Sequence, residues 1–213
     1  MAKPRRDLGE NFNTVSSAVR KGNSVLVLGE AGTGKAEFAQ SLYECLAGEF
    51  DCAIAIYKGS GKKFFQTIAL QLGVPIDDED TGKLLTMDRL KEEIAINCGD
   101  RTLLIFPEAK RLTTGIRYWL EDLIVAGARL ICFAVANPGR DIFLNMTEIE
   151  LELPSDRYIR LVMAAEAQRQ GLNLSKSRLA ALQPMAGRNP MLARKIVRNE
   201  ALGLEQGVKR RYV

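Results

Sequence analysis

One eight-residue stretch, Gly29-Glu30-Ala31-Gly32-Thr33-Gly34-Lys35-Ala36, limits what this chain can fold into. It follows an apolar run at 24–28 and precedes a segment whose apolar residues recur with helical spacing: Phe38, Leu42, Cys45 and Leu46. A strand, a glycine-rich turn and a helix in this order form the context of a phosphate-binding loop, in which backbone N–H groups and the helix N-terminus face an anion. We therefore expect residues 29–36 to bind a nucleotide, with Lys35 reaching its β and γ phosphates.

The stretch departs from the motif G-x-x-x-x-G-K-[ST] at its last position, where Ala36 replaces Ser or Thr. That residue normally supplies the hydroxyl that holds Mg²⁺. Phosphate binding and Mg²⁺-dependent hydrolysis are therefore separate questions for this chain. The alternative interpretation is a glycine-rich turn between a strand and a helix, with Lys35 as a surface lysine.

Composition excludes several classes of function. The 213 residues include no histidine, which rules out histidine triads and histidine metal sites, and they carry a net charge of only +4. The four cysteines (Cys45, Cys52, Cys98 and Cys132) lack C-x-x-C spacing, and we expect them to be buried thiols in a reducing compartment. Neither a signal peptide nor an apolar run of membrane-spanning length is evident, so the expected location is cytoplasmic.

The pattern of apolar residues predicts an α/β fold. Five apolar or alternating runs predict strands, at 24–28, 51–57, 102–106, 129–135 and 148–153. Amphipathic segments between them predict helices, at 7–21, 35–47, around 65–72, 87–98 and 116–124. Because most of the strands are apolar on both faces, we expect a five-stranded parallel sheet with helices on both faces. The run at 148–153 alternates with glutamates, which indicates an edge strand.

After Pro154 the sequence predicts only helices, at 155–170, 175–184 and 190–203, with Asn189 and Pro190 starting the last one. We therefore expect a P-loop nucleotide-binding α/β domain at 1–154, a small helical lid at 155–205 and a basic tail at 206–213.

A P-loop sheet followed by a helical lid resembles the AAA+ ATPases, and most of all the branch that holds initiator-type ATPases, ExeA-like ATPases and the transposition regulators TniB and TnsC. The run Leu103 to Ala109 is similar to the Walker B motif of that family. The resemblance implies that Glu108 activates water and that Asn137 is the polar sensor-1 residue. Gly187-Arg188-Asn189-Pro190 with Arg194 resembles the sensor-2 helix, in which either Arg194 or Arg188 would face the phosphates.

Two positions depart from the family pattern. Pro107 stands where the family has the Walker B Asp, and Ala36 stands where it has the hydroxyl, so both protein anchors for Mg²⁺ are missing. We assign no metal ligand and leave a role for Mg²⁺ open. Arg140 is the nearest candidate for an arginine finger, and a surface arginine after a turn is the preferred interpretation of it.

Three functions follow from the resemblance and these departures. The preferred one is an AAA+-like protein that binds ATP or ADP with impaired or absent hydrolysis and acts as an assembly or regulatory component in DNA transactions such as transposition. The second is an active DNA-dependent ATPase that uses Glu108. The third is a nucleotide-free scaffold or signalling module. For the first, we expect a homo-oligomer or a partner protein of a DNA-processing complex.

Double-stranded DNA is the expected polyanionic partner. Lys58, Lys62 and Lys63 follow the second predicted strand, in a region that the transposition-type relatives use to track the DNA backbone. Further basic clusters lie at Lys3–Arg6, Arg194–Arg198 and Lys209–Arg211. The alternative is that these side chains only solubilise a loop and the chain ends.

Overall fold

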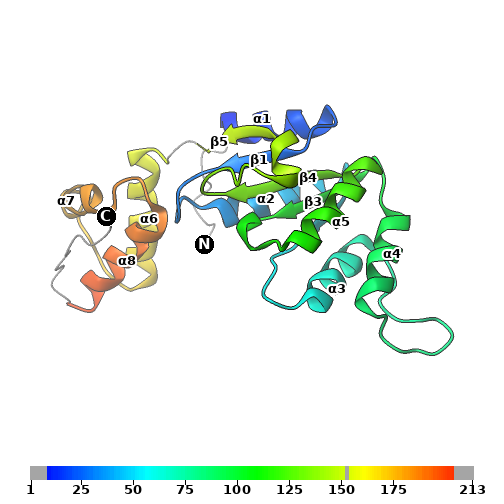
Figure 1. Cartoon of the computed structure of the whole chain (residues 1–213). Helices are drawn as coiled ribbons and strands as arrows, with labels where there is room; N and C mark the ends of the chain where they lie inside the picture. The colour runs from blue at the N-terminus through cyan, green and yellow to red at the C-terminus, as the bar shows by residue number, and fades with distance from the viewer. Residues whose placement is uncertain (1–8, 152–153, 204–213) are drawn as a thin grey trace. The chain divides into compact units, whose positions relative to one another are not determined.

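Five parallel strands form a single sheet in the computed structural model, which describes residues 9–151 and 154–203 (Figure 1). Their order across the sheet is β2-β3-β4-β1-β5, and every pairing is parallel. The strands are β1 (Val25–Leu28), β2 (Asp51–Ile54), β3 (Thr102–Phe106), β4 (Arg129–Ala134) and β5 (Thr147–Glu150). The predicted α/β class and parallel five-stranded sheet are confirmed, with β5 at one edge.

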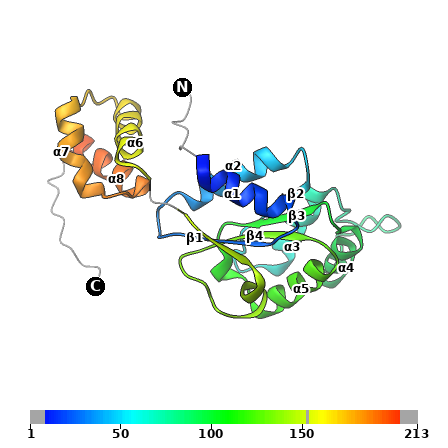
Figure 2. The ribbon, with the colours of Figure 1, turned by 90° about the horizontal axis from the view of Figure 1, so that it is seen from above.

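Helices cover both faces of this sheet (Figure 2). On one face, α1 (Gly9–Arg20) and α2 (Lys35–Leu46) meet the strands through aromatic rings: Phe38 lies edge-on between Phe12 and Phe133. On the other face, the buried side chains of α3 (Gly61–Leu72), α4 (Met87–Asn97) and α5 (Thr114–Val125) share a core with alternate residues of β4. This two-sided burial explains why β3 is buried along its whole length.

Local sequence accounts for the helix boundaries on the second face. Ser60, Thr86 and Thr113 are the N-caps of α3, α4 and α5, respectively. The side chain of each accepts a hydrogen bond from a backbone N–H in the first turn of its helix. At the other end of α3, Gly73 adopts φ 70°, the left-handed conformation that ends a helix, and its N–H caps the last carbonyls.

Two short 3₁₀-helices were not predicted from the sequence: η1 (Ala109–Arg111) and η2 (Asp141–Asn145). The buried Arg117 of α5 holds η2, because its Nε donates to Asp141 at 2.5 Å. Its Nη1 donates to the Leu112 carbonyl, in the turn after η1. These contacts join residues far apart in sequence, so local periodicity contains no signal for them.

The three helices after residue 154 have a core of their own. They are α6 (Asp156–Arg169), α7 (Lys176–Ala186) and α8 (Pro190–Ala201), with N-caps Ser155, Ser175 and Asn189. Apolar residues from all three helices pack together, including Met163, Leu182 and Val197. The carboxylate of Glu166 is also buried among them, and it accepts hydrogen bonds from Arg198 and Gln170.

Contacts divide the described residues into two units. The α/β unit comprises 9–30 and 35–151, and the helical unit comprises 154–203, with which 31–34 are grouped. No helix within these residues is long and apolar enough to cross a membrane. The predicted tail at 206–213, the basic clusters Lys3–Arg6 and Lys209–Arg211, and the end of the strand expected at 148–153 lie outside the described residues.

Two details of the sequence interpretation were wrong. The second strand ends at Ile54 rather than at residue 57. Cys45, which was expected to be buried in the stripe of the second helix, is exposed, because that face of α2 points away from the sheet. Cys52 and Cys132 are buried, and burial raises the pKa of the Cys52 thiol to about 12.

Candidate functional site

The loop between β1 and α2 has the backbone that its glycines predict. Gly32 and Gly34 adopt φ values of 80° and 87°, a region that other L-residues rarely enter. The Gly29 N–H donates to the Ala134 carbonyl at 3.0 Å, which continues the pairing of β1 with β4 into the loop. Because α2 begins at Lys35, the N–H groups of its first turn have no partner within the helix. The loop therefore leads directly into a helix N-terminus, as anion binding requires.

Lys35 folds back over this loop. Its Nζ donates to the carbonyls of Gly29 and Glu30, at 2.5 and 2.6 Å. Burial lowers the pKa of Lys35, the charge of Lys110 lowers it further, and Glu30 partly offsets both. An ammonium group is thus held at the loop with a second cation near enough to affect it, and both favour a polyanionic ligand.

Glu108 lies two residues after β3, at the edge of the sheet where β1 also ends. Its carboxylate forms an ion pair with Arg111, three residues along in η1. The pair is partly exposed and keeps the proposed water-activating carboxylate engaged with a cation. The sequence identified Glu108 and did not identify Arg111 as its partner, although the spacing i,i+3 was visible.

Asn137 follows β4 at the same edge. Its Nδ2 donates to the Glu148 carboxylate on β5, and its Oδ1 accepts from the Gly139 N–H at 2.7 Å. Asn137 therefore lies after the strand, as the sequence predicted, and its side chain forms hydrogen bonds with Glu148 and Gly139. Its role as the sensor-1 residue stays a prediction. Glu148 was not singled out from the sequence, because the pairing of β1 with β5 is what brings it near.

The other predicted site residues are distributed over both units. Lys58, Lys62 and Lys63 are exposed, around the start of α3, and Arg140 is exposed just before η2. Arg194 lies on α8 in the helical unit and is partly buried. Its assignment to the phosphate site, and that of the three lysines to DNA, stay predictions.

The residues at the Mg²⁺ positions do not fit a metal. Ala36 offers a methyl group and Pro107 a buried ring, and neither has a ligand atom in its side chain. Among the residues that the structure describes, no group of three or more Asp, Glu, Cys or His side chains could hold an ion. The loop and Lys35, by contrast, fit a nucleotide through their amide and ammonium donors.

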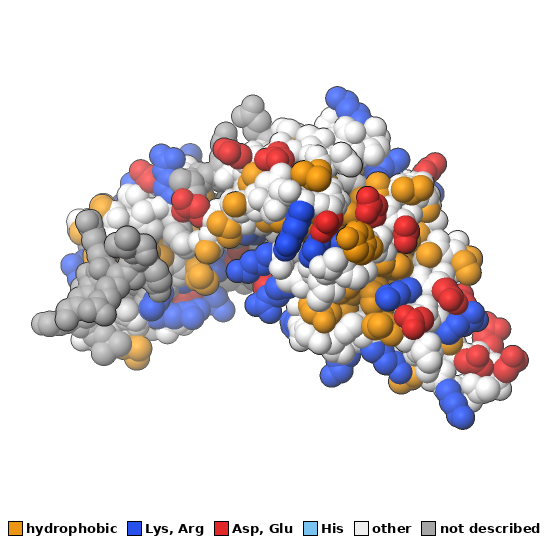
Figure 3. Space-filling view, viewed as in Figure 1, with side chains coloured by type: hydrophobic (Ala, Val, Ile, Leu, Met, Phe, Trp, Pro, Cys, Tyr) orange, Lys and Arg blue, Asp and Glu red, His pale blue; other side chains and the backbone are white. Residues whose placement is uncertain are grey.

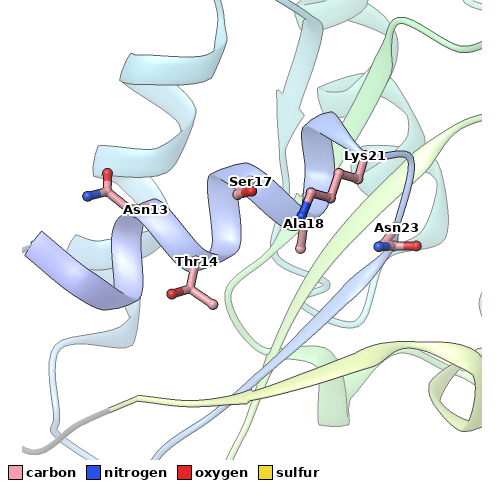
Figure 4. A pocket seen from close by; sticks show the side chains of 6 residues that line it. All are labelled: Asn13, Thr14, Ser17, Ala18, Lys21 and Asn23. Carbon is pink, nitrogen blue, oxygen red and sulfur yellow. The ribbon is translucent and has the colours of Figure 1, made fainter.

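A separate shallow depression runs along the exposed side of α1 (Figure 4). It is lined by small polar or aliphatic side chains: Asn13, Thr14, Ser17, Ala18, Lys21 and Asn23. None of the predicted site residues lines it. Its open shape offers a ligand little burial, so we assign it no role.

Comparison with known proteins identifies the fold. No protein-family model matches the sequence, and no curated protein matches it either. Among solved structures, Cdc6p from Pyrobaculum aerophilum is similar with a TM-score of 0.64 at 16% identity, over 95% of this chain and 63% of that one. Domain III of DnaA from Thermotoga maritima is similar with a TM-score of 0.58 at 14% identity, over 95% and 87%.

A DnaA structure bound to AMPPCP and single-stranded DNA is also similar, with a TM-score of 0.57 at 15% identity, over 96% of this chain and 64% of that one. This chain thus spans less than two thirds of the DnaA chain. The structural neighbours are AAA+ P-loop ATPases, and the chain has the fold of their α/β and helical parts. At these identities the likeness establishes the fold alone.

Proposed function

We propose that this chain is an AAA+-like nucleotide-binding protein that binds ATP or ADP, hydrolyses it very slowly or not at all, and acts as an assembly or regulatory component in DNA transactions such as transposition. The observation that carries the proposal is the loop itself: two glycines with positive φ, a helix that begins at Lys35, and the Lys35 ammonium held over the loop carbonyls.

The loop supplies the contacts that a nucleotide needs. The backbone N–H groups around Gly32 and Gly34 and those opening α2 would bind the phosphates, and Lys35 would exchange its two carbonyl acceptors for phosphate oxygens. Arg194 of α8 is proposed as a further phosphate contact. A bound triphosphate would supply the scissile bond, and this chain's contribution would be to bind and orient it.

Impaired hydrolysis follows from the residues around Glu108. Phosphoryl transfer depends on a metal that neutralises charge and on a positioned base. Ala36 and Pro107 provide no metal ligand, and the Glu108 carboxylate is paired with Arg111. Removing such groups typically costs several kcal/mol of transition-state stabilisation.

The test is calorimetric titration with ATP and ADP, together with an assay of phosphate release. We expect saturable binding of both nucleotides, no phosphate release above background, and a loss of at least about 100-fold in affinity for Lys35→Ala. Lys21 is an exposed lysine just after α1, and Lys21→Ala is the matched control, which should bind normally. Phosphate release that vanishes on Glu108→Gln would instead establish an active ATPase, and the absence of any binding would establish a nucleotide-free scaffold.

The charge distribution supports DNA as the partner. Residues 155–203 contain nine Lys and Arg and three Asp and Glu, which gives a net charge of +6. Residues 9–151 contain fifteen Lys and Arg and twenty Asp and Glu, which gives a net charge of −5. On the face drawn in Figure 3, Lys and Arg predominate over the helical unit, and Asp and Glu gather on the loop before α4. A polyanion is therefore attracted most strongly to the helical unit, and Lys58, Lys62 and Lys63 would add a local contact on the α/β unit.

With this function we expect the chain to be cytoplasmic, as a homo-oligomer or as a partner protein within a DNA-processing complex. Sedimentation with and without ATP and DNA tests the assembly. A monomer under all four conditions would contradict the oligomer.

A further inference from the structure

Two features near the loop between β1 and α2 call for an explanation. Both positions that would hold Mg²⁺ lack ligand atoms in their side chains, and Lys110, a lysine outside the recognised motifs, follows β3 at the end of the sheet where β1 leads into the loop. We propose that Lys110 takes the place of the metal, so that nucleotide phosphates are bound between two lysines, Lys35 and Lys110, without a requirement for Mg²⁺. This inference rests on the proposed nucleotide binding.

Buried residues anchor the turn that carries Lys110 on both sides. Ala109 and Leu112 are buried, at 1% and 3% exposure, and the Leu112 N–H donates to the Ala109 carbonyl at 3.0 Å. Between these two anchors the Lys110 side chain is exposed. The turn also packs against β4, the strand that separates β3 from β1. Its position therefore follows from the sheet.

The sheet brings the two lysines to the same edge. β1 leads into Lys35 and β3 leads into Lys110, and both strands are parallel to β4 between them. Neighbouring strands lie about 4.8 Å apart, so the segments that follow β1 and β3 leave the sheet about 10 Å from each other. Long lysine side chains can converge on one anion across that span. The charge of Lys110 also contributes to lowering the pKa of Lys35, which agrees with this arrangement.

Neighbouring charges leave Lys110 available. Glu108, the nearest carboxylate along the chain, is paired with Arg111. Lys110 itself forms no ion pair with any residue in the described part of the chain. A lysine ammonium without a carboxylate partner, at the same end of the sheet as a second ammonium, raises the local positive potential, which is the contribution that a metal otherwise makes to polyphosphate binding.

The experiment compares nucleotide affinity in Mg²⁺ and in EDTA for three proteins: wild type, Lys110→Gln and Lys83→Gln. Lys83 is an exposed lysine in the turn before α4 and serves as the matched control. We expect wild-type and Lys83→Gln affinities for ATP to change less than about threefold between the two conditions. In EDTA, Lys110→Gln should bind ATP about tenfold more weakly than wild type does. Its affinity for ATP should recover in part with Mg²⁺, and its loss of affinity for ADP should be smaller than its loss for ATP. Lys110→Arg should retain binding in EDTA.

The outcomes separate this inference from the proposed function. If wild type binds ATP but Lys110→Gln binds it equally well in EDTA, the role of Lys110 is refuted and nucleotide binding stands. If wild-type binding disappears in EDTA, Mg²⁺ is required and the replacement is refuted as well. If wild type binds no nucleotide under either condition, the proposed function fails and this inference fails with it. Thermal unfolding of each variant verifies that the substitution leaves the fold intact.

Discussion

The α/β unit and the helical unit are built on different balances of forces. In the α/β unit, all five residues of β3 are buried and both faces of the sheet are covered, so the core is continuous and apolar. The helical unit has a smaller core that also encloses the Glu166 carboxylate, which is 2% exposed. Its partner Arg198 is half-exposed, whereas in the α/β unit both members of the pair Arg117 and Asp141 are largely buried, at 6% and 20% side-chain exposure.

The two units also differ in net charge. The α/β unit is acidic overall, with a net charge of −5 over residues 9–151, yet the charge of Lys110 contributes to lowering the pKa of Lys35 at its loop. The helical unit is basic, with a net charge of +6 over residues 155–203. The comparison teaches that a net charge of +4 conceals two units of opposite sign, so the two units attract a polyanion to different extents.

The largest expected effect is in the sheet core. Phe133→Ala should lower the free energy of unfolding by about 4 kcal/mol, because it removes a fully buried ring that packs edge-on against Phe38. Urea denaturation followed by the fluorescence of Trp119, the single tryptophan, reports on this unit. Val135→Ala is the control two residues along, where the side chain is 54% exposed, and should cost less than about 0.5 kcal/mol.

A smaller effect is expected in the helical core. Met163→Ala should cost about 3 kcal/mol, because Met163 is fully buried among the three helices. If the two cores unfold independently, the loss appears in helical circular dichroism while the Trp119 transition is unchanged. Met191→Ala, at an exposed position on α8, is the control. Equal shifts by both probes would show that the two units unfold as one.

The buried carboxylate makes the helical unit sensitive to acid. Burial alone would raise the pKa of Glu166, but hydrogen bonds from Arg198 and Gln170 and the charges of Arg198 and Arg169 outweigh burial and lower it. Its stabilisation is therefore complete above the unfolded pKa of about 4.3 and is lost as pH falls through the lower folded pKa. Glu166→Gln should cost about 2 kcal/mol at pH 7 and little at pH 3.

Thermal unfolding at pH 7, 5 and 3 measures this difference. Glu200→Gln is the matched control, because Glu200 pairs with Arg178, which is half-exposed, and such a pair is worth at most about 1 kcal/mol. A cost for Glu166→Gln that did not shrink between pH 5 and pH 3 would contradict the assignment.

The smallest expected effect concerns DNA. Replacing Arg157 and Arg160 of α6 with glutamine should weaken binding to double-stranded DNA about fivefold and reduce its salt dependence, because both side chains are exposed on the basic unit. The same change at Lys62 and Lys63 should have a smaller effect. Fluorescence anisotropy at low and physiological salt measures both. A larger loss at the lysines would locate the DNA contact on the α/β unit, and affinity that ignores salt would contradict an electrostatic contact altogether.

Much of this architecture was predictable because its signals are local. Apolar runs at 102–106 and 129–135 correspond to β3 and β4, and the glycines at 32 and 34 correspond to positive φ. Helix caps such as Asn189 were visible for the same reason. Cys45 was misplaced because helical spacing alone does not say how wide the buried stripe is.

The sequence by itself determined the parallel sheet, the positive φ values of the loop between β1 and α2, and the lack of ligand atoms in the side chains at 36 and 107, since each depends on residue type and near neighbours. Only the tertiary structure decided that Arg111 forms an ion pair with Glu108 and that Asn137 donates a hydrogen bond to Glu148. The same holds for the contribution of the Lys110 charge to lowering the pKa of Lys35. The physical reason is that strand order places distant segments at one edge of the sheet. Charges there interact through space, and no local pattern encodes that distance.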